Sequence, residues 1–273
     1  MKTSIKRFFS IILDFLSFIL VWFLLSSLYS VIFITNNSVY QNNTDTISSC
    51  LVETNLYEIK DGNTVQVDDD LNRRFVIFYT DNKYLDTYDK YSSFEESKKN
   101  SGLFEYSTSE LYYVEKEGVE KEELTYFYSK EFKKLEVCLY NTNQEFKVAL
   151  DYNQNVTTVG SFVTIIISSL LIYFVMPLIL KKGQSLFYKI FKLVIISEDD
   201  KDPSFGQLFI HAWANTFVIL LGFKFYFISF LIVFLVFVID KKHRTLGDFA
   251  SVTKCEELVE YEKKRRWFSS FRW

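Results

Sequence analysis

The chain has 273 residues, of which 49% are hydrophobic and 19% aromatic, with 31 Lys and Arg against 34 Asp and Glu. The net charge is −3, and nothing in its distribution indicates a nucleic acid as partner. The abundance of Asn, Lys, Ile, Phe and Tyr, with few Ala and Pro, is typical of an AT-rich, bacterial genome.

Three long apolar runs indicate helices that cross a membrane. Residues 8–34 contain one charged side chain, Asp14; residues 152–180 contain none; and residues 203–239 contain two ionisable side chains. A span needs about 20 consecutive apolar residues. We therefore predict a multi-pass α-helical membrane protein, with the lipid bilayer as its first partner.

Basic residues flank these runs, and short basic flanks stay in the cytoplasm. They are Lys2, Lys6 and Arg7 before the first run, Lys181 and Lys182 after the second, and Lys241, Lys242 and Arg244 after the third. This pattern predicts a plasma-membrane protein with both termini in the cytoplasm. It places residues 35–157, with 13 Lys and Arg against 23 Asp and Glu, outside the cytoplasm.

The third run has to begin and end on the cytoplasmic side, so we expect it to form a short hairpin. One helix of its 37 residues would be about 55 Å long, against a hydrocarbon core of about 30 Å. The predicted arms are residues 207–221 and 225–239, with a turn near Gly222, which makes four spans. The alternative is a surface helix at 204–215 followed by one span, which makes three.

The sequence of residues 35–157 favours a β-rich or α+β domain. Asp61-Gly62-Asn63 predicts the turn of a hairpin between residues 51–59 and 64–67. A linker is expected at 36–49, and either a short helix or a loop at 88–100. Further strands are predicted at 74–80, 110–114, 124–129, 135–140 and 145–150.

Two cysteines, Cys50 and Cys138, fall near the two ends of this domain. A disulfide between them would close a loop of about 88 residues and contribute about 4 kcal/mol. The alternative is two buried thiols that stay reduced. The acidic and Tyr-rich composition fits either a binding face for an extracellular cationic ligand or an ordinary solvated surface. The oligomeric state is not indicated.

Three segments resemble the RDD family of membrane proteins, which is named after one arginine and two aspartates. Arg7 opens the first run and Asp14 lies within it. Gly183-Gln184-Ser185-Leu186 is similar to the G-Q-T-L sequence that follows the family's second span. Residues 240–253 are similar to its D-x-x-R-R-T-L-H-D-L-L-A-G-T ending.

The match is not complete. Phe187, Tyr188 and Lys192 depart from the second motif, His211 replaces a common arginine, and Gly247 replaces the histidine before Asp248. The resemblance covers residues 1–34 and 158–254. Residues 35–157 are then an insertion, and residues 255–273 a basic and aromatic cytoplasmic tail. The resemblance implies transport, including cation and proton exchange.

Asp14 is the residue whose role matters most, since a carboxylate inside a span costs roughly 2.5–3.5 kcal/mol. Arg7 precedes it by seven residues, so both lie on one helical face about 10 Å apart. Arg7 is expected to reach lipid headgroups, Asp240 or Asp248. We expect the partner of Asp14 to be Arg244, whose guanidinium fork fits a carboxylate, and His211 second.

Two interpretations of these charges stay open. The first is a structural ion-pair network that holds the bundle together. The second is an ion-coupling site, because a carboxylate withdrawn from water favours its protonated form and can exchange a proton for a cation. The residues concerned are Arg7, Asp14, His211, Asp240, Arg244 and Asp248.

Other candidate sites concern lipid. Lys189 and Lys192, with apolar neighbours, predict an interfacial helix at 184–196. Arg265 and Arg266 in the tail predict contact with anionic lipid. No catalytic motif is recognised, so we expect neither an enzyme, nor a cofactor, nor a metal site. The predicted function is a transporter or transport accessory for cations or small solutes. The alternative is a non-transporting anchor that presents an extracytoplasmic binding or sensing domain.

Overall fold

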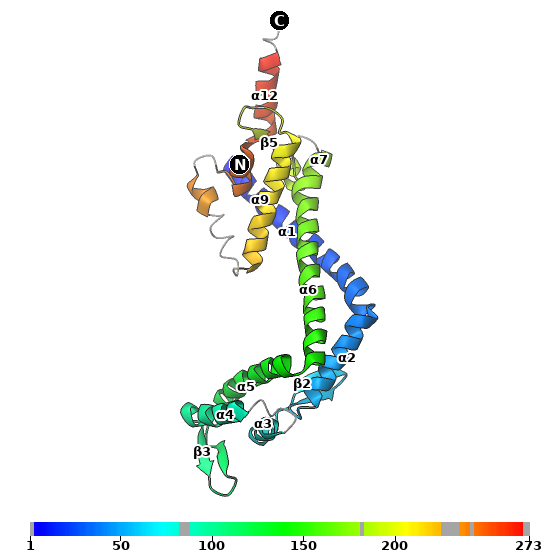
Figure 1. Cartoon of the computed structure of the whole chain (residues 1–273). Helices are drawn as coiled ribbons and strands as arrows, with labels where there is room; N and C mark the ends of the chain where they lie inside the picture. Colours follow the sequence, from blue (N-terminus) through cyan, green and yellow to red (C-terminus); the bar gives the residue numbers. More distant parts are fainter. Residues whose placement is uncertain (1–2, 82–87, 181–182, 225–234, 241–242, 270–273) are drawn as a thin grey trace. The chain divides into compact units, whose positions relative to one another are not determined.

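The computed structural model describes residues 3–81, 88–180, 183–224, 235–240 and 243–269. It divides the chain into two compact units (Figure 1). The membrane unit comprises Met1–Ile32 and Thr158–Trp273, and the inserted unit comprises Phe33–Thr157. Each unit is mostly helical, with only short two-stranded sheets among the described residues.

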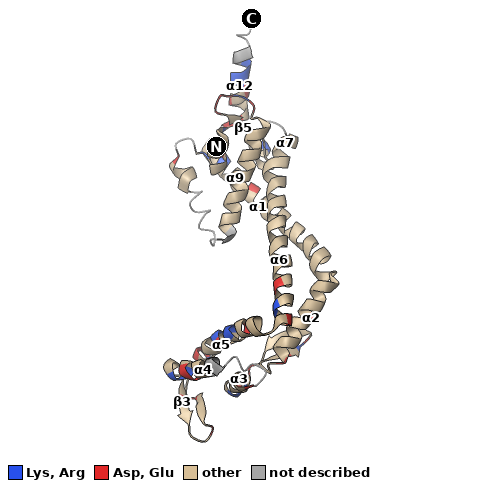
Figure 2. Cartoon of the chain, viewed as in Figure 1, with Lys and Arg blue, Asp and Glu red and all other residues tan. Residues whose placement is uncertain are grey.

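Among the described residues, three helices are long and apolar enough to cross a membrane: Thr3–Thr35, Gln144–Leu180 and Phe205–Gly222. The first contains α1 (Thr3–Ser30) and η1 (Val31–Thr35), the second contains α6 (Gln144–Leu170), η3 (Leu171–Val175) and α7 (Met176–Leu180), and the third is part of α9 (Phe205–Lys224). These helices confirm the predicted membrane-protein character. The ribbon in Figure 2, coloured by residue type, shows few charged residues on α9 and on the apolar part of α6.

The predicted turn near Gly222 is wrong, because α9 continues through this glycine to Lys224. A glycine inside a helix costs only about 1 kcal/mol relative to alanine, which the surrounding apolar helix tolerates. Most of the second predicted arm, residues 225–239, lies outside the described residues, and residues 235–239 are helical.

Three of the four buried residues of helix α1 are polar, while many of its apolar side chains are exposed. Arg7, Ser10, Asp14 and Phe18 are its buried residues, and their spacing of three to four places them on one face. Phe23, on another face, is 68% exposed. This inverted pattern is the one expected where lipid rather than water surrounds a helix.

Hydroxyl groups join the spans. Ser26 of α1 donates to Thr164 of α6 at 3.2 Å, and the hydroxyls of Ser169 and Thr216 join α6 to α9 at 2.7 Å. Small polar side chains of this kind commonly hold membrane helices together. Gly160 adds a close approach, since a Cβ there would lie only 2.1 Å from the ring of Tyr29.

A small sheet corrects the predicted interfacial helix at 184–196. Helix α8 (Leu186–Ile190) is a single turn, and Lys192 then adopts a φ of +57°. The chain continues as β5 (Leu193–Ser197), which pairs antiparallel with β6 (Thr253–Glu257). Four successive buried residues, three of them β-branched, favour a strand here. Helices α11 (Leu246–Ser251) and α12 (Leu258–Ser269) flank β6, so the segment after residue 254 is folded rather than a plain tail.

The inserted unit contains two hairpins and several helices. Strands β1 (Tyr57–Lys60) and β2 (Asn63–Gln66) form the predicted hairpin around Asp61-Gly62, with Lys60 opposite Asn63. The predicted first strand at 51–59 is too long, because residues 51–52 belong to α2 and β1 begins at Tyr57. Strands β3 (Phe104–Ser107) and β4 (Tyr112–Glu115) form the second hairpin, close to the predicted strand at 110–114. Its helices are α2 (Ser38–Val52), α3 (Leu71–Thr80), α4 (Tyr88–Ser101) and α5 (Lys121–Thr142).

Four predicted strands are wrong, and the β-rich expectation fails with them. Residues 74–80 belong to α3, residues 124–129 and 135–140 to α5, and residues 145–150 to α6. Their aromatic content resembles that of strands, but the buried positions follow a helical period. The buried residues of α5 are Phe127, Tyr128, Glu131, Phe132, Leu135, Cys138 and Leu139.

The predicted linker at 36–49 is helix α2. Asn37 caps it, because its side-chain oxygen accepts from Val39 N at 3.0 Å and from Tyr40 N at 3.2 Å. Asn153 of α6 donates to Tyr40 O at 3.3 Å and to Thr44 Oγ1 at 3.1 Å, which ties α2 to the start of α6. These contacts explain why a polar segment forms a helix.

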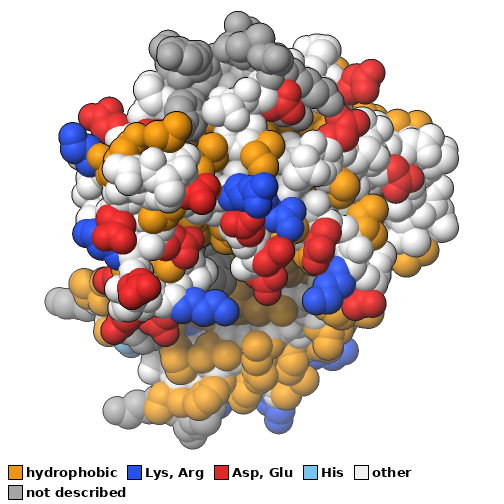
Figure 3. All heavy atoms as spheres, turned by 90° about the horizontal axis from the view of Figure 1, so that it is seen from below, with side chains coloured by type: hydrophobic (Ala, Val, Ile, Leu, Met, Phe, Trp, Pro, Cys, Tyr) orange, Lys and Arg blue, Asp and Glu red, His pale blue; other side chains and the backbone are white. Residues whose placement is uncertain are grey.

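Aromatic rings fill the core of the inserted unit. Phe75 is fully buried, and its ring stacks on that of Tyr128 with centroids 5.8 Å apart. Phe94, Phe104 and Phe132 belong to the same cluster. On the face shown in Figure 3, charged and apolar side chains are mixed.

Candidate functional site

The candidate site lies in the membrane unit, where α1 brings Arg7 and Asp14 against α8, α9 and α11. Arg7 and Asp14 lie on the buried face of α1, with 2% and 4% of their surface exposed. Both therefore need partners from other elements, since an isolated buried charge is costly. Arg7 and Asp14 have different partners, and these partners decide what each side chain can do.

Arg7 forms a buried ion pair with Asp248 of α11. Thr245, the N-cap of α11, donates to the same carboxylate from its backbone N at 2.6 Å and from its hydroxyl at 2.8 Å. Burial alone would raise the pKa of Asp248, but the Arg7 guanidinium, followed by His211 and the Thr245 N–H, holds it well below its usual range. Asp248 is therefore ionised and paired, which suits a structural role.

His211 of α9 lies on the other side of Asp248. Its Nδ1 is 3.3 Å from Nδ2 of Asn215, one turn further along α9. Its Nε2 is 3.5 Å from Oδ1 of Asp248, and within the described part of the chain this nitrogen makes no hydrogen bond. The imidazole is thus buried and held from one side, with a weak contact on the other.

Gly247 leaves the space that His211 occupies. A Cβ at residue 247 would lie 2.9 Å from Cδ2 of His211 and 3.0 Å from Oδ1 of Asn215. Real Cβ atoms do not approach neighbours so closely, so any larger residue would displace the imidazole. The glycine in this motif is therefore explained by packing against α9.

Asp14 has a hydroxyl partner rather than a cation. Ser185 donates its hydroxyl to Oδ2 of Asp14 at 2.5 Å, and the same hydroxyl accepts from Tyr188 N as the cap of α8. Asp14 makes no ion pair with any described residue. The carboxylate is therefore oriented by α8 without being neutralised by it.

Arg244, the predicted partner of Asp14, lies elsewhere. Its guanidinium pairs with Asp240 at 3.3 Å and with Glu198 at 2.9 Å, and it stacks over the ring of Phe249 at 4.0 Å. The prediction of an Asp14–Arg244 contact is wrong, because Arg244 forms an ion pair with Asp240, four positions earlier in the chain. Asp240 and Arg244 form a half-buried pair apart from Asp14.

A cavity of about 300 Å³ adjoins Asp14. Most of its wall is apolar, with aromatic rings such as Phe15 and Phe237. Polar groups enter it from five elements, among them Asp14, Tyr173, Ser185, His211, Asn215 and Thr245. Small-ligand pockets have this composition, with few polar groups placed in an apolar wall.

The structure thus brings four of the predicted residues together, namely Arg7, Asp14, His211 and Asp248. Sequence reasoning missed Ser185 and Asn215. Ser185 stood inside the recognised Gly-Gln-Ser-Leu segment, and a serine before a helical turn is an N-cap signal. Asn215 follows His211 by four residues, so both side chains point to the same side of α9.

The remaining predicted sites are exposed or untested. Lys189, Lys192, Arg265 and Arg266 are all exposed, and Arg265 also pairs with Asp202 at 3.3 Å. Cys50 and Cys138 are buried in one hydrophobic core, and their disulfide stays a prediction. Among the described residues, no group of three or more His, Cys, Asp or Glu is arranged to hold a metal ion.

Comparison with known proteins bears on the membrane region. The model of the RDD family matches residues 136–251, a segment that includes α9 and Asp248 and begins after Asp14. No curated protein and no solved structure matches the chain. The family match agrees with the three candidate membrane-spanning helices. The resemblance predicted from the sequence is confirmed over residues 136–251, which match the RDD family of membrane proteins.

Proposed function

We propose that this protein moves a cation or a small solute across the membrane, with Asp14 as the ion-coupling group. The observation that carries the proposal is the state of Asp14: a carboxylate buried within a span, held by the Ser185 hydroxyl, beside a cavity of about 300 Å³. Ionisable groups inside membrane spans commonly mark ion and proton pathways.

The charges of the site support this role. Arg7 and Asp248 neutralise each other, whereas Asp14 borders the cavity and forms no ion pair with a described residue. A cation or a proton bound at Asp14 would neutralise the negative charge of its carboxylate. The Arg7–Asp248 pair then serves to fix α1 against α11 and takes no direct part in transport.

The proposal includes a topology. Basic flanks on the cytoplasmic side place both termini inside and residues 35–157 outside, which requires a fourth span after α9. Fusions of a topology reporter after Thr44, Lys201, Lys224 and Trp273 test this arrangement. An external signal at Trp273 would replace four spans by three.

Flux into proteoliposomes tests the role of Asp14. Purified protein is reconstituted with a pH-sensitive dye inside the vesicles, and Na⁺ or K⁺ is added outside. We expect Asp14→Asn to reduce cation-dependent proton movement by about tenfold or more, since a contact to a charged group contributes roughly 1.5–3 kcal/mol. Asp45→Asn, an exposed substitution of the same kind in α2, serves as control. Equal flux in both variants would remove Asp14 from the mechanism.

A second candidate function is an anchor that presents a binding domain without transport. The inserted unit favours it, because this unit holds a pocket of about 720 Å³. An anchor would lose its function when residues 45–150 are deleted, whereas Asp14→Asn would lower only its abundance. Neither function requires catalysis, and we propose none.

A further inference from the structure

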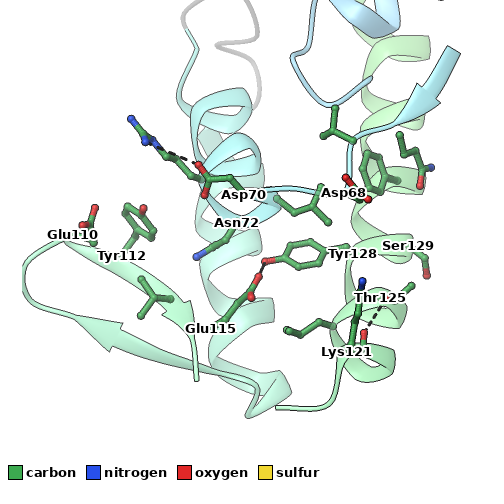
Figure 4. Close-up of a pocket in the computed structure, with 17 residues that line it drawn as sticks. Asp68, Asp70, Asn72, Glu110, Tyr112, Glu115, Lys121, Thr125, Tyr128 and Ser129 are labelled. Carbon is green, nitrogen blue, oxygen red and sulfur yellow. Dashed lines mark hydrogen bonds and ion pairs between the residues drawn. The ribbon is translucent and has the colours of Figure 1, made fainter. Parts of the chain in front are cut away.

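A pocket of about 720 Å³ lies within the inserted unit, apart from the site around Asp14 (Figure 4). Its wall comes from the end of β2, the start of α3, the β3–β4 hairpin and the first half of α5. Its volume falls in the range of about 300–1,000 Å³ that is usual for small-molecule sites.

Carboxylates from separate segments border this pocket. Asp68 and Asp70 come from the loop before α3, while Glu110 and Glu115 come from the β3–β4 hairpin (Figure 4). Two basic side chains, Arg73 and Lys121, also line the pocket. A guanidinium nitrogen of Arg73 lies 4.0 Å from a carboxylate oxygen of Asp70. The acidic groups outnumber the basic ones, so the pocket favours a positive ligand.

Aromatic rings form the inner wall. Phe132 and Tyr128 of α5 are buried, and Tyr112 of β4 is half-buried. The hydroxyl of Tyr128 donates to Oε1 of Glu115 at 2.6 Å, as Figure 4 shows. Burial, and then the Glu115 carboxylate that accepts its hydrogen bond, raise the pKa of Tyr128 above its usual range.

A metal ion does not fit this distribution. No three acidic, His or Cys side chains in the described ranges are close enough to hold one. A cation that meets carboxylates spread around an aromatic wall has to be extended or bulky. Organic ammonium ions satisfy both conditions, because they contact ring faces as well as carboxylates.

The same unit already holds an ammonium group in this way. Lys98 is fully buried, with Nζ 4.6 Å from the ring centroid of Phe94 and 5.3 Å from that of Tyr112. Its charge pairs with Glu95 at 2.5 Å. Tyr112 therefore takes part in one ammonium site inside the core and also lines the pocket.

We propose that the pocket of the inserted unit binds an organic ammonium ion. The carboxylates of Asp68, Asp70 and Glu115 pair with the ammonium groups, and the rings of Tyr112 and Tyr128 pack against the methylene or methyl groups next to them. This site is independent of the proposed transport role of Asp14.

Isothermal titration calorimetry of the full-length protein in detergent tests the proposal. The probes are spermidine, with several ammonium groups on a chain, choline, with one quaternary group, and Mg²⁺. We expect spermidine or choline to bind with one site per chain, and Mg²⁺ at equal concentration not to displace it. Which probe binds more tightly separates an extended polyamine from a compact quaternary ion.

Matched variants locate the site. Glu115→Gln and Asp68→Asn should each weaken binding at least tenfold, whereas Glu105→Gln, an exposed change on β3 outside the pocket, should leave it unchanged. Tyr112→Phe keeps the ring and should keep most of the affinity, while Tyr112→Leu should lose it. Circular dichroism checks that each variant is folded.

Three results would overturn the proposal: no binding of either organic probe, binding that survives Glu115→Gln and Asp68→Asn, or displacement by Mg²⁺ at equal concentration. Asp14→Asn provides the separation from transport. It should bind the organic probe as the wild type does, so loss of flux and loss of this binding are distinguishable.

Discussion

The two units of this chain place polar and apolar side chains in opposite ways. In the membrane unit, Arg7, Asp14 and Asp248 are buried, while apolar residues such as Phe23 are exposed. In the inserted unit the rings of Phe75 and Phe132 are buried and charges lie mostly on the surface. Stability in the first therefore depends on polar contacts, and in the second on apolar burial.

The largest loss of stability is expected from Arg7→Leu, a substitution in the membrane unit. The change leaves the Asp248 carboxylate buried without its cation, which costs about 3–5 kcal/mol of unfolding free energy. Thermal unfolding in detergent measures the loss. The double variant Arg7→Leu/Asp248→Asn should recover part of it, and Arg73→Leu, a 69% exposed arginine of the inserted unit, should change little. If the Arg7→Leu protein is as stable as the wild type, the stability of the membrane unit does not depend on this polar contact.

The matching apolar test is Leu135→Ala in the core of the inserted unit. This side chain is fully buried, so its truncation should cost about 2–5 kcal/mol. Val137→Ala, at a residue of the same helix that is 60% exposed, should cost far less. Equal losses in the two variants, measured by denaturant unfolding, would show that α5 does not pack as described.

A smaller effect is expected from Gly247→Ala. The added methyl group meets His211 and Asn215, and overpacking of this kind costs about 1–3 kcal/mol. Gly206→Ala is the control, since its nearest neighbour would be 4.0 Å away. If both substitutions are tolerated equally in thermal unfolding, His211 does not lie against α11.

The smallest loss of stability is expected from a substitution at the start of α2. Asn37→Ala removes the side chain that caps Val39 N and Tyr40 N, which should cost about 1 kcal/mol. Asn37→Asp keeps an accepting oxygen and should keep the stability. Amide exchange of the first turn of α2 measures the change most directly, and unaltered exchange in Asn37→Ala would argue against the cap.

Much of the membrane unit was predictable from hydrophobicity and one charge. The absence of other charges around Asp14 predicted the first span, and the interval of seven residues predicted that Arg7 shares its face. The partner of Asp14 was not predictable, because the guanidinium of Arg244 is equally suited to the carboxylates of Asp14 and Asp240. Only the fold shows that Arg244 forms its ion pair with Asp240, the aspartate nearer in sequence. Ser185 acts through a helix cap that the interfacial-helix prediction obscured.

The inserted unit was harder to predict because its aromatic residues suit strands and buried helix faces alike. Phe75, Phe78 and Tyr79 follow a helical spacing, yet their residue types favour a strand. Only the Asp-Gly turn gave an unambiguous local signal, and the hairpin it predicts is present. The pocket could not be foreseen, since its carboxylates come from segments about 40 residues apart that the helical core brings together.

Cation-dependent proton flux in proteoliposomes that contain wild type, Asp14→Asn or Asp14→Glu directly tests the claim that Asp14 couples cation and proton movement. A coupling carboxylate predicts that Asn abolishes most of the flux, while Glu, which keeps the acid, restores a measurable part of it. Flux that is equal in the wild type and Asp14→Asn would contradict the claim and leave Asp14 with a structural role.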